Sequence, residues 1–103
     1  MEYSHPSVRL AEVRRLIDIG SVIINGNAQR SAMADFGFDQ ADVYAAINRL
    51  NARDFHKSAD HNTLKGIRVD TYKKRGLHLN EDIYTHFHVR NGKLVIASFK
   101  ELK

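Results

Sequence analysis

The chain has 103 residues, which suits one domain, over residues 1–103, with a modest hydrophobic core. Hydrophobic residues make up 43% and charged residues 27%, which excludes a disordered chain. Because there is no cysteine, disulfides, zinc–thiolate sites and cysteine nucleophiles are excluded, and no apolar stretch approaches the length of a membrane span. The first ten residues lack the apolar run of a signal peptide, so we expect a cytoplasmic protein.

Charge is distributed unevenly along the chain. The net charge is +4, but residues 1–52 hold five Lys or Arg against six Asp or Glu, whereas residues 53–103 hold eleven against six. Five of the six histidines also lie in the second half. A basic half favours an anionic partner, most simply nucleic acid, although an ordinary solvated surface explains the charge as simply.

Helical spacing of apolar residues dominates the first half. Gly20 and Gly37 are typical of helix ends, and Asp39 is a suitable N-cap for the segment that follows it. The pattern predicts three helices, at about 7–19, 27–36 and 40–51, with a brief strand or extended link at 21–25.

Alternation of side chains dominates the second half. It predicts strands at 54–58, 67–74, 83–89 and 93–100, connected by an exposed loop at 59–66, a turn segment at 75–82 and a hairpin turn. Helices followed by strands indicate an α+β fold, with N-terminal helices packed on a C-terminal antiparallel sheet.

The hairpin turn decides which side chains of the last two strands share a face. A two-residue turn at Asn91-Gly92 leaves both faces a mixture of polar and apolar residues. A three-residue turn from Arg90 to Gly92 gives a coherent apolar face, with Phe87 opposite Val95 and Ile83 opposite Phe99. We therefore predict the three-residue turn, with Phe87, Val95 and Phe99 buried. The other face then receives Tyr84, His86, His88, Leu94, Ile96, Ser98 and Lys100.

A phenol, imidazoles and an ammonium on a basic sheet suit metal-free cleavage of RNA. The 2′-hydroxyl of RNA is its own nucleophile, so the protein needs only proton transfer and cations that stabilise the crowded phosphate. Tyr84 and Lys100 are the central candidates, while His86 and His88 could transfer protons or contact RNA.

Other interpretations of these residues stay open. His86 and His88 could be polar decoration of a strand, or they could bind zinc with a third ligand from His56, His61 or Asp82. No standard metal-ligand spacing is present, so we expect no metal and no cofactor. The basic segment that begins at Lys73 is most simply solvated surface.

Several segments together resemble the MqsR family of bacterial toxins. They are "HPSVRLAEVRRLI" near the start, "DFHKS" at 54–58, "DTY" at 70–72, the tyrosine of "DIYTHFHV" and "LVIASFKE" near the end. The resemblance spans nearly the whole chain. It implies a RelE-like α+β fold and an endoribonuclease that cuts mRNA without the ribosome, at short sites containing G and C.

The resemblance also implies site residues and a partner. The active-site positions of the family match Lys57, Tyr84 and Lys100. Apart from the family pattern, we expect Arg68, Lys73, His86 and His88 to contact RNA. A glutamine that the family uses just before the Asp of "DTY" is replaced here by Val69. The expected partners are mRNA and a cognate MqsA-like antitoxin, which in this family is a separate DNA-binding protein.

Two other functions are compatible with the same sequence. One is a non-catalytic module that binds RNA or DNA with its basic sheet. The other is an inactive toxin relative that still binds an antitoxin. Turnover of RNA separates the enzyme from both.

Overall fold

The computed structural model describes residues 1–78 and 81–102, with side chains for 1–76 and 82–102. In chain order, its elements are β1 (Glu2–Tyr3), α1 (Leu10–Asp18), β2 (Val22–Ile24), α2 (Gly26–Phe36), α3 (Gln40–Asn48), the short 3-10 helix η1 (Ala52–Asp54), β3 (Phe55–Asp60), β4 (Arg68–His78), β5 (Glu81–Arg90) and β6 (Lys93–Glu101). The predicted α+β class is confirmed.

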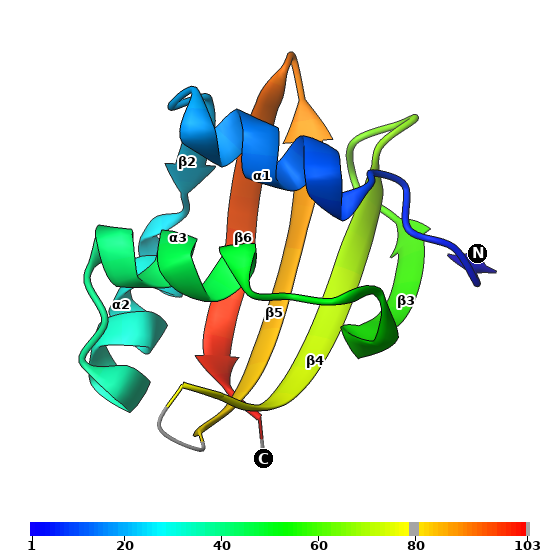
Figure 1. The fold of residues 1–103 in the computed structure, drawn as a ribbon. Coiled ribbons are helices and arrows are strands. Elements are labelled where there is room, and N and C mark those ends of the chain that lie inside the picture. Colours follow the sequence, from blue (N-terminus) through cyan, green and yellow to red (C-terminus); the bar gives the residue numbers. More distant parts are fainter. Residues whose placement is uncertain (79–80, 103) are drawn as a thin grey trace.

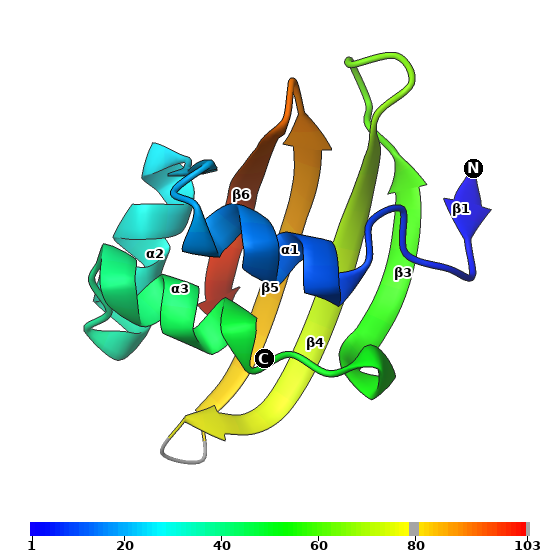
Figure 2. The same ribbon diagram turned by 45° about the horizontal axis from the view of Figure 1, so that its top comes forward.

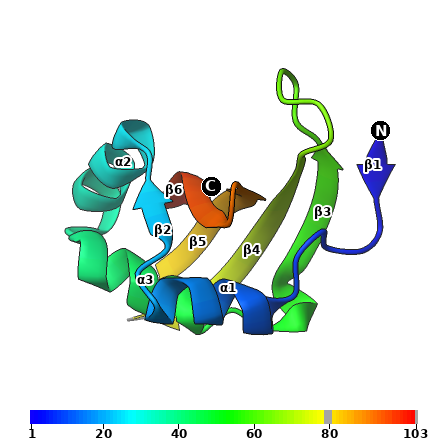
Figure 3. The same cartoon turned by 90° about the horizontal axis from the view of Figure 1, so that it is seen from above.

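The strands form one six-stranded sheet in the order β1-β3-β4-β5-β6-β2. All neighbours are antiparallel except β2, which runs parallel to β6. Helices α1 and α3 cross one face of this sheet, and α2 lies beside β6 and β2 (Figures 1 and 2). Seen from above, the opposite face carries no helix over β3, β4 and β5 in the described part of the chain (Figure 3). We call this opposite side the open face.

The helices form where their sequence signals predict. Helix α2 ends at Phe36 and is capped by Gly37, whose φ of 73° is a left-handed conformation that favours glycine. Helix α3 starts with a capping box, in which Asp39 and Asp42 each accept the other's backbone N–H at 2.9–3.0 Å. It ends at Asn48, three residues before the predicted end at 51.

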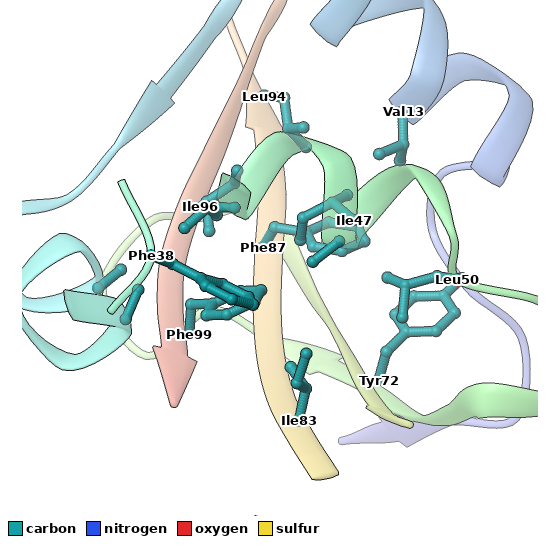
Figure 4. Close-up of a cluster of buried hydrophobic side chains, with 14 of the residues drawn as sticks. Val13, Phe38, Ile47, Leu50, Tyr72, Ile83, Phe87, Leu94, Ile96 and Phe99 are labelled. Atoms are coloured by element: carbon teal, nitrogen blue, oxygen red, sulfur yellow. The ribbon is translucent and has the colours of Figure 1, made fainter. Parts of the chain in front are cut away.

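The core lies between the helices and the covered face of the sheet (Figure 4). Tyr72 on β4 stacks on Phe87 on β5, with ring centroids 5.5 Å apart. Burial is the main reason that the pKa of Tyr72 is raised to about 12, so its phenol stays neutral. The labelled core residues in Figure 4 are Val13, Phe38, Ile47, Leu50, Tyr72, Ile83, Phe87, Leu94, Ile96 and Phe99.

A buried carboxylate joins the start of α1 to the sheet. Asp70 on β4 is fully buried and accepts hydrogen bonds from the backbone and hydroxyl of Ser7, the backbone of Val8 and the hydroxyl of Ser58, at 2.7–3.1 Å. Because the Ser7 and Val8 amides are held outside the helix, α1 begins at Leu10 and not at the predicted residue 7.

Three strand boundaries differ from the prediction. Strand β3 continues to Asp60, so the predicted loop at 59–66 starts two residues too early. Strands β4 and β5 extend into the predicted turn segment 75–82, and its remaining residues 79–80 lie outside the described residues. The two-residue strand β1, which pairs with β3, was not predicted because two residues carry no periodicity.

The hairpin between β5 and β6 uses the two-residue turn, so the predicted three-residue turn is wrong. Arg90 pairs with Lys93, and Asn91 and Gly92 both have positive φ, at 52° and 73°. A register shift on β6 then skips Ala97 between the Ile96 and Ser98 pairings. The two-residue turn puts Leu94 and Ile96 on the buried side, and the shift adds Phe99 to that side. The predicted core residue Val95 lies opposite His88 instead.

Candidate active site on the open face

The end of the open face nearest α2 carries a row of two lysines and a tyrosine. Tyr84 on β5 pairs with Lys73 on β4 and with Lys100 on β6, so all three side chains leave the sheet on the same side. The Lys100 ammonium lies 5.1 Å from the centroid of the Tyr84 ring. This spacing is within the range of a cation–π contact, and it places a positive charge beside the phenol.

A cavity of about 540 Å³ lies over this row. It is lined by Asp35, Lys73, Tyr84, Lys100, Glu101 and Leu102. Asp35 comes from α2 and accepts the backbone N–H of Glu101 at 2.9 Å, which ties the end of β6 to the helix. Sequence analysis missed Asp35, since nothing in the local sequence of α2 indicates contact with a strand 66 residues away.

A second row lies one step along the strands. Thr71 on β4 pairs with Lys57 on β3 and with His86 on β5, and His86 pairs in turn with Ser98 on β6. The predicted sharing of one face by Tyr84, Ser98 and Lys100 is therefore confirmed. It holds despite the wrong turn because the skipped Ala97 restores the alternation.

Lys57 lies at the far end of this second row. Its backbone is two strand spacings from that of His86, which is about 10 Å. The ammonium of Lys57 is 3.4 Å from a carboxylate oxygen of Glu2 on β1, and the two side chains are 41% and 66% exposed. An exposed ion pair of this kind contributes little to stability, so Lys57 remains available to an anionic ligand.

Three imidazoles extend the open face away from Tyr84. The rings of Tyr84 and His86 meet edge to face with centroids 5.8 Å apart, and those of His88 and His61 do so at 5.3 Å. Burial, followed by nearby positive groups, lowers the pKa of both His86 and His88, so both are neutral at pH 7. The Nδ1 atoms of both side chains are buried, with no hydrogen-bond partner in the described part of the chain.

Arg68 is separated from the other predicted site residues. Its pairing with Asp60 puts it on the covered side of the sheet, in the same alternation as Asp70. There the guanidinium donates to the Ser58 hydroxyl at 3.1 Å and lies 3.8 Å from the centroid of the Tyr3 ring. Arg68 therefore holds the first residues against the sheet, and we leave it out of the candidate site.

The site is made of lysine ammonium groups, a phenol, a hydroxyl and imidazoles. Among the described residues, no three His, Cys, Asp or Glu side chains form a group that could hold a metal ion. The zinc interpretation of His86 and His88 thus finds no complete ligand set there. Separately, no helix within residues 1–78 and 81–102 is long and apolar enough to cross a membrane.

One comparison with known proteins gives a match. The model of a family described as "Motility quorum-sensing regulator, toxin of MqsA" matches residues 5–101, which is nearly the whole chain. No curated protein matches the chain in the corresponding search. The matched range includes every residue of the two rows described above.

Proposed function

Because the chain belongs to the family of motility quorum-sensing regulators, toxins of MqsA, we propose that it is an endoribonuclease. Membership makes it a toxin of a toxin–antitoxin system. Its substrate would be mRNA, cut at short sites that contain G and C. The observation that supports this activity best is the row of Lys73, Tyr84 and Lys100 beneath an open cavity.

Cleavage would proceed by attack of the RNA 2′-hydroxyl on the adjacent phosphorus. Negative charge then grows on the phosphate oxygens, and Lys100 and Lys57 supply the compensating cations. Tyr84 orients the phosphate or exchanges a proton with it. Lys73 and His86 would contact the RNA, since cations bind phosphates and imidazole rings stack on unpaired bases. The predicted RNA contact of His88 is not supported, because its ring is buried against His61 and only 5% of its surface is exposed.

The partner would be an antitoxin of the MqsA type, because the family is described as the toxin of MqsA. An unrestrained ribonuclease destroys the messages of the cell that makes it. A bound protein that keeps RNA away from the open face would suppress this damage, and the toxin would act in the cytoplasm once released.

Cleavage of a defined RNA by the pure protein in excess EDTA tests the proposed activity. We expect cleavage to persist, with 2′,3′-cyclic phosphate ends or their hydrolysis products, because the side chains themselves supply the charge and the protons. Loss of cleavage in EDTA that a divalent ion restores would contradict a metal-independent mechanism.

Val69 favours a second candidate, an inactive relative that still binds its antitoxin. It lies on the open face in the same alternation as Thr71, at the position where the resemblance implies a glutamine. A valine side chain cannot hydrogen-bond to RNA. Absence of RNA turnover with or without divalent ions, together with binding of the antitoxin, would establish this second candidate.

A further inference from the structure

We infer that His86 is a further catalytic residue, the one that accepts the proton of the attacking 2′-hydroxyl. This inference rests on the proposed ribonuclease activity. The imidazole of His86 would act as the general base, a role that the lysines cannot fill. Lysine ammonium groups carry no lone pair at neutral pH, and a phenol serves there as a proton donor and not as a base. A neutral imidazole is the side chain best suited to take a proton near pH 7.

The position of His86 joins the two rows of the open face. Its ring meets the Tyr84 ring edge to face, and its backbone pairs with Thr71 on one side and Ser98 on the other. A phosphate held between Lys57 and Lys100 would therefore have an imidazole and a phenol beside it, on adjacent same-face positions of one strand.

The surroundings of His86 keep it ready to accept a proton. Its Nδ1 is buried without a hydrogen-bond partner in the described residues, so no carboxylate there holds the ring in its charged form. Burial is the largest cause of its lowered pKa, and electrostatic interactions with His88, Lys100 and His61 lower the pKa further. Among the described residues, the titratable and charged groups on the open face or lining its cavity are Glu2, Asp35, Lys57, His61, Lys73, Tyr84, His88, Arg90, Lys100 and Glu101.

His88 and His61 are worse placed for this role. Only 5% of the His88 surface is exposed, and it lies opposite Val95, away from the lysine row. The His61 ring packs on His88, and its Nδ1 accepts the backbone N–H groups of Thr63 and Leu64 at 3.1 Å. Of these three histidines, only His86 has a ring contact with Tyr84, and it is half-buried and not closed off from solvent.

The proposed step conserves atoms and charge. The O2′–H bond breaks as its proton moves to an imidazole nitrogen of His86, and the freed electron pair forms the O2′–P bond. The P–O5′ bond breaks, and the leaving 5′ oxygen takes the Tyr84 hydroxyl proton. The phenolate forms beside the Lys100 ammonium, 5.1 Å from the ring centroid, and the proton on His86 then returns to it through water.

The dependence of single-turnover cleavage on pH tests this inference in the parent protein, independently of any variant. We expect the rate to fall on the acid side with an apparent pKa below 6.5, the ordinary value for histidine, as His86 becomes protonated. A rate that does not fall as the pH drops through this region would overturn the inference while leaving the ribonuclease activity established.

Substitution of His86 identifies the group that titrates. We expect His86→Gln to lower the rate about a hundredfold or more and to remove the acid limb. His56→Gln removes an exposed imidazole on β3 and should leave both the rate and the acid limb unchanged. With His86→Ala, added imidazole should restore part of the lost rate.

These experiments distinguish a wrong role for His86 from a wrong assignment of ribonuclease activity. Cleavage by His86→Gln at the parent rate with the acid limb intact would overturn the role of His86 alone. Absence of cleavage by the parent protein at every pH would overturn the proposed function and this inference with it. Thermal melts of both His86 variants establish that they are folded before their rates are compared.

Discussion

At the scale of single residues, burial decides what the histidines of the open face can do. His86 and His88 alternate on one strand, but both lack a hydrogen-bond partner for Nδ1 within the described part of the molecule. Protonating either ring places a charge among other positive groups, with burial as the larger cost. Both rings therefore favour the neutral form in the folded protein more than in the unfolded chain.

This preference predicts a stability that decreases in acid. Because the folded pKa values lie below the ordinary value of 6.5, the unfolded chain takes up protons first as the pH falls through 6.5. The histidine contribution to the free energy of unfolding is thus fully present above 6.5 and declines below it. Urea unfolding of the parent and of a His86→Gln, His88→Gln double variant across this range measures the effect.

The double variant should lose less stability than the parent between neutral and acid pH. His56→Gln serves as the control, because its imidazole is exposed and its removal should leave the parent slope unchanged. Equal slopes for the parent and the double variant would show that His86 and His88 titrate alike in the folded and unfolded states.

At the scale of elements, the hairpin of β5 and β6 brings Tyr84 and Lys100 together. Alternation along β5 predicted the open face correctly because each second residue of a strand shares a side. The extra residue Ala97 on β6 was beyond prediction, since a bulge has no signature of its own in alternating side chains. Because no bulge was expected, the three-residue turn sorted the faces better, and that turn put Leu94 and Ile96 on the wrong side and Val95 in the core.

The hairpin turn gives a direct test of this element. Gly92 has φ of 73°, and a Cβ added there meets nothing within 4 Å, so a substitution changes only the backbone energy. We expect Gly92→Val to lower the free energy of unfolding by about 1–2 kcal/mol in urea melts. Asn91→Gly, at φ of 52°, relieves strain and should not destabilise the hairpin. Equal stability of Gly92→Val and the parent would contradict the assigned turn.

At the scale of the whole molecule, Asp70 links the helical layer to the sheet. Alternation along β4 places Arg68 and Asp70 on one side and Val69 on the other, without deciding which side is buried. The side with Asp70 faces the core, because donors from Ser7, Val8 and Ser58 satisfy its carboxylate inside the protein. Those donors lie up to 63 residues away, so no local pattern could place Asp70 or its neighbour Arg68 correctly.

Removing this carboxylate should therefore destabilise the entire fold. Asp70→Ala leaves several buried donors unpaired, and we expect it to cost about 3–5 kcal/mol of unfolding free energy. Asp60→Ala on the neighbouring strand removes an exposed carboxylate and should change stability by about 0.5 kcal/mol or less. Urea melts that give the two variants the same stability would refute this role for Asp70.

The central claim is that the open face cleaves RNA with Tyr84 and Lys100, and single-turnover cleavage by variants tests it most directly. Tyr84→Phe keeps the ring and removes only the hydroxyl, and Lys100→Ala removes an exposed ammonium beside it. We expect both to reduce the rate of cleavage about a hundredfold or more, with melting temperatures close to that of the parent.

Lys73→Ala is the contrasting variant, because it removes a charge opposite Tyr84 that the account assigns to RNA binding. It should weaken binding and its salt dependence while leaving most of the rate at saturating protein. We therefore expect slow cleavage by Tyr84→Phe and Lys100→Ala, and cleavage at nearly the parent rate by Lys73→Ala at saturating protein. Parent rates for Tyr84→Phe and Lys100→Ala, with a loss only in Lys73→Ala, would contradict it.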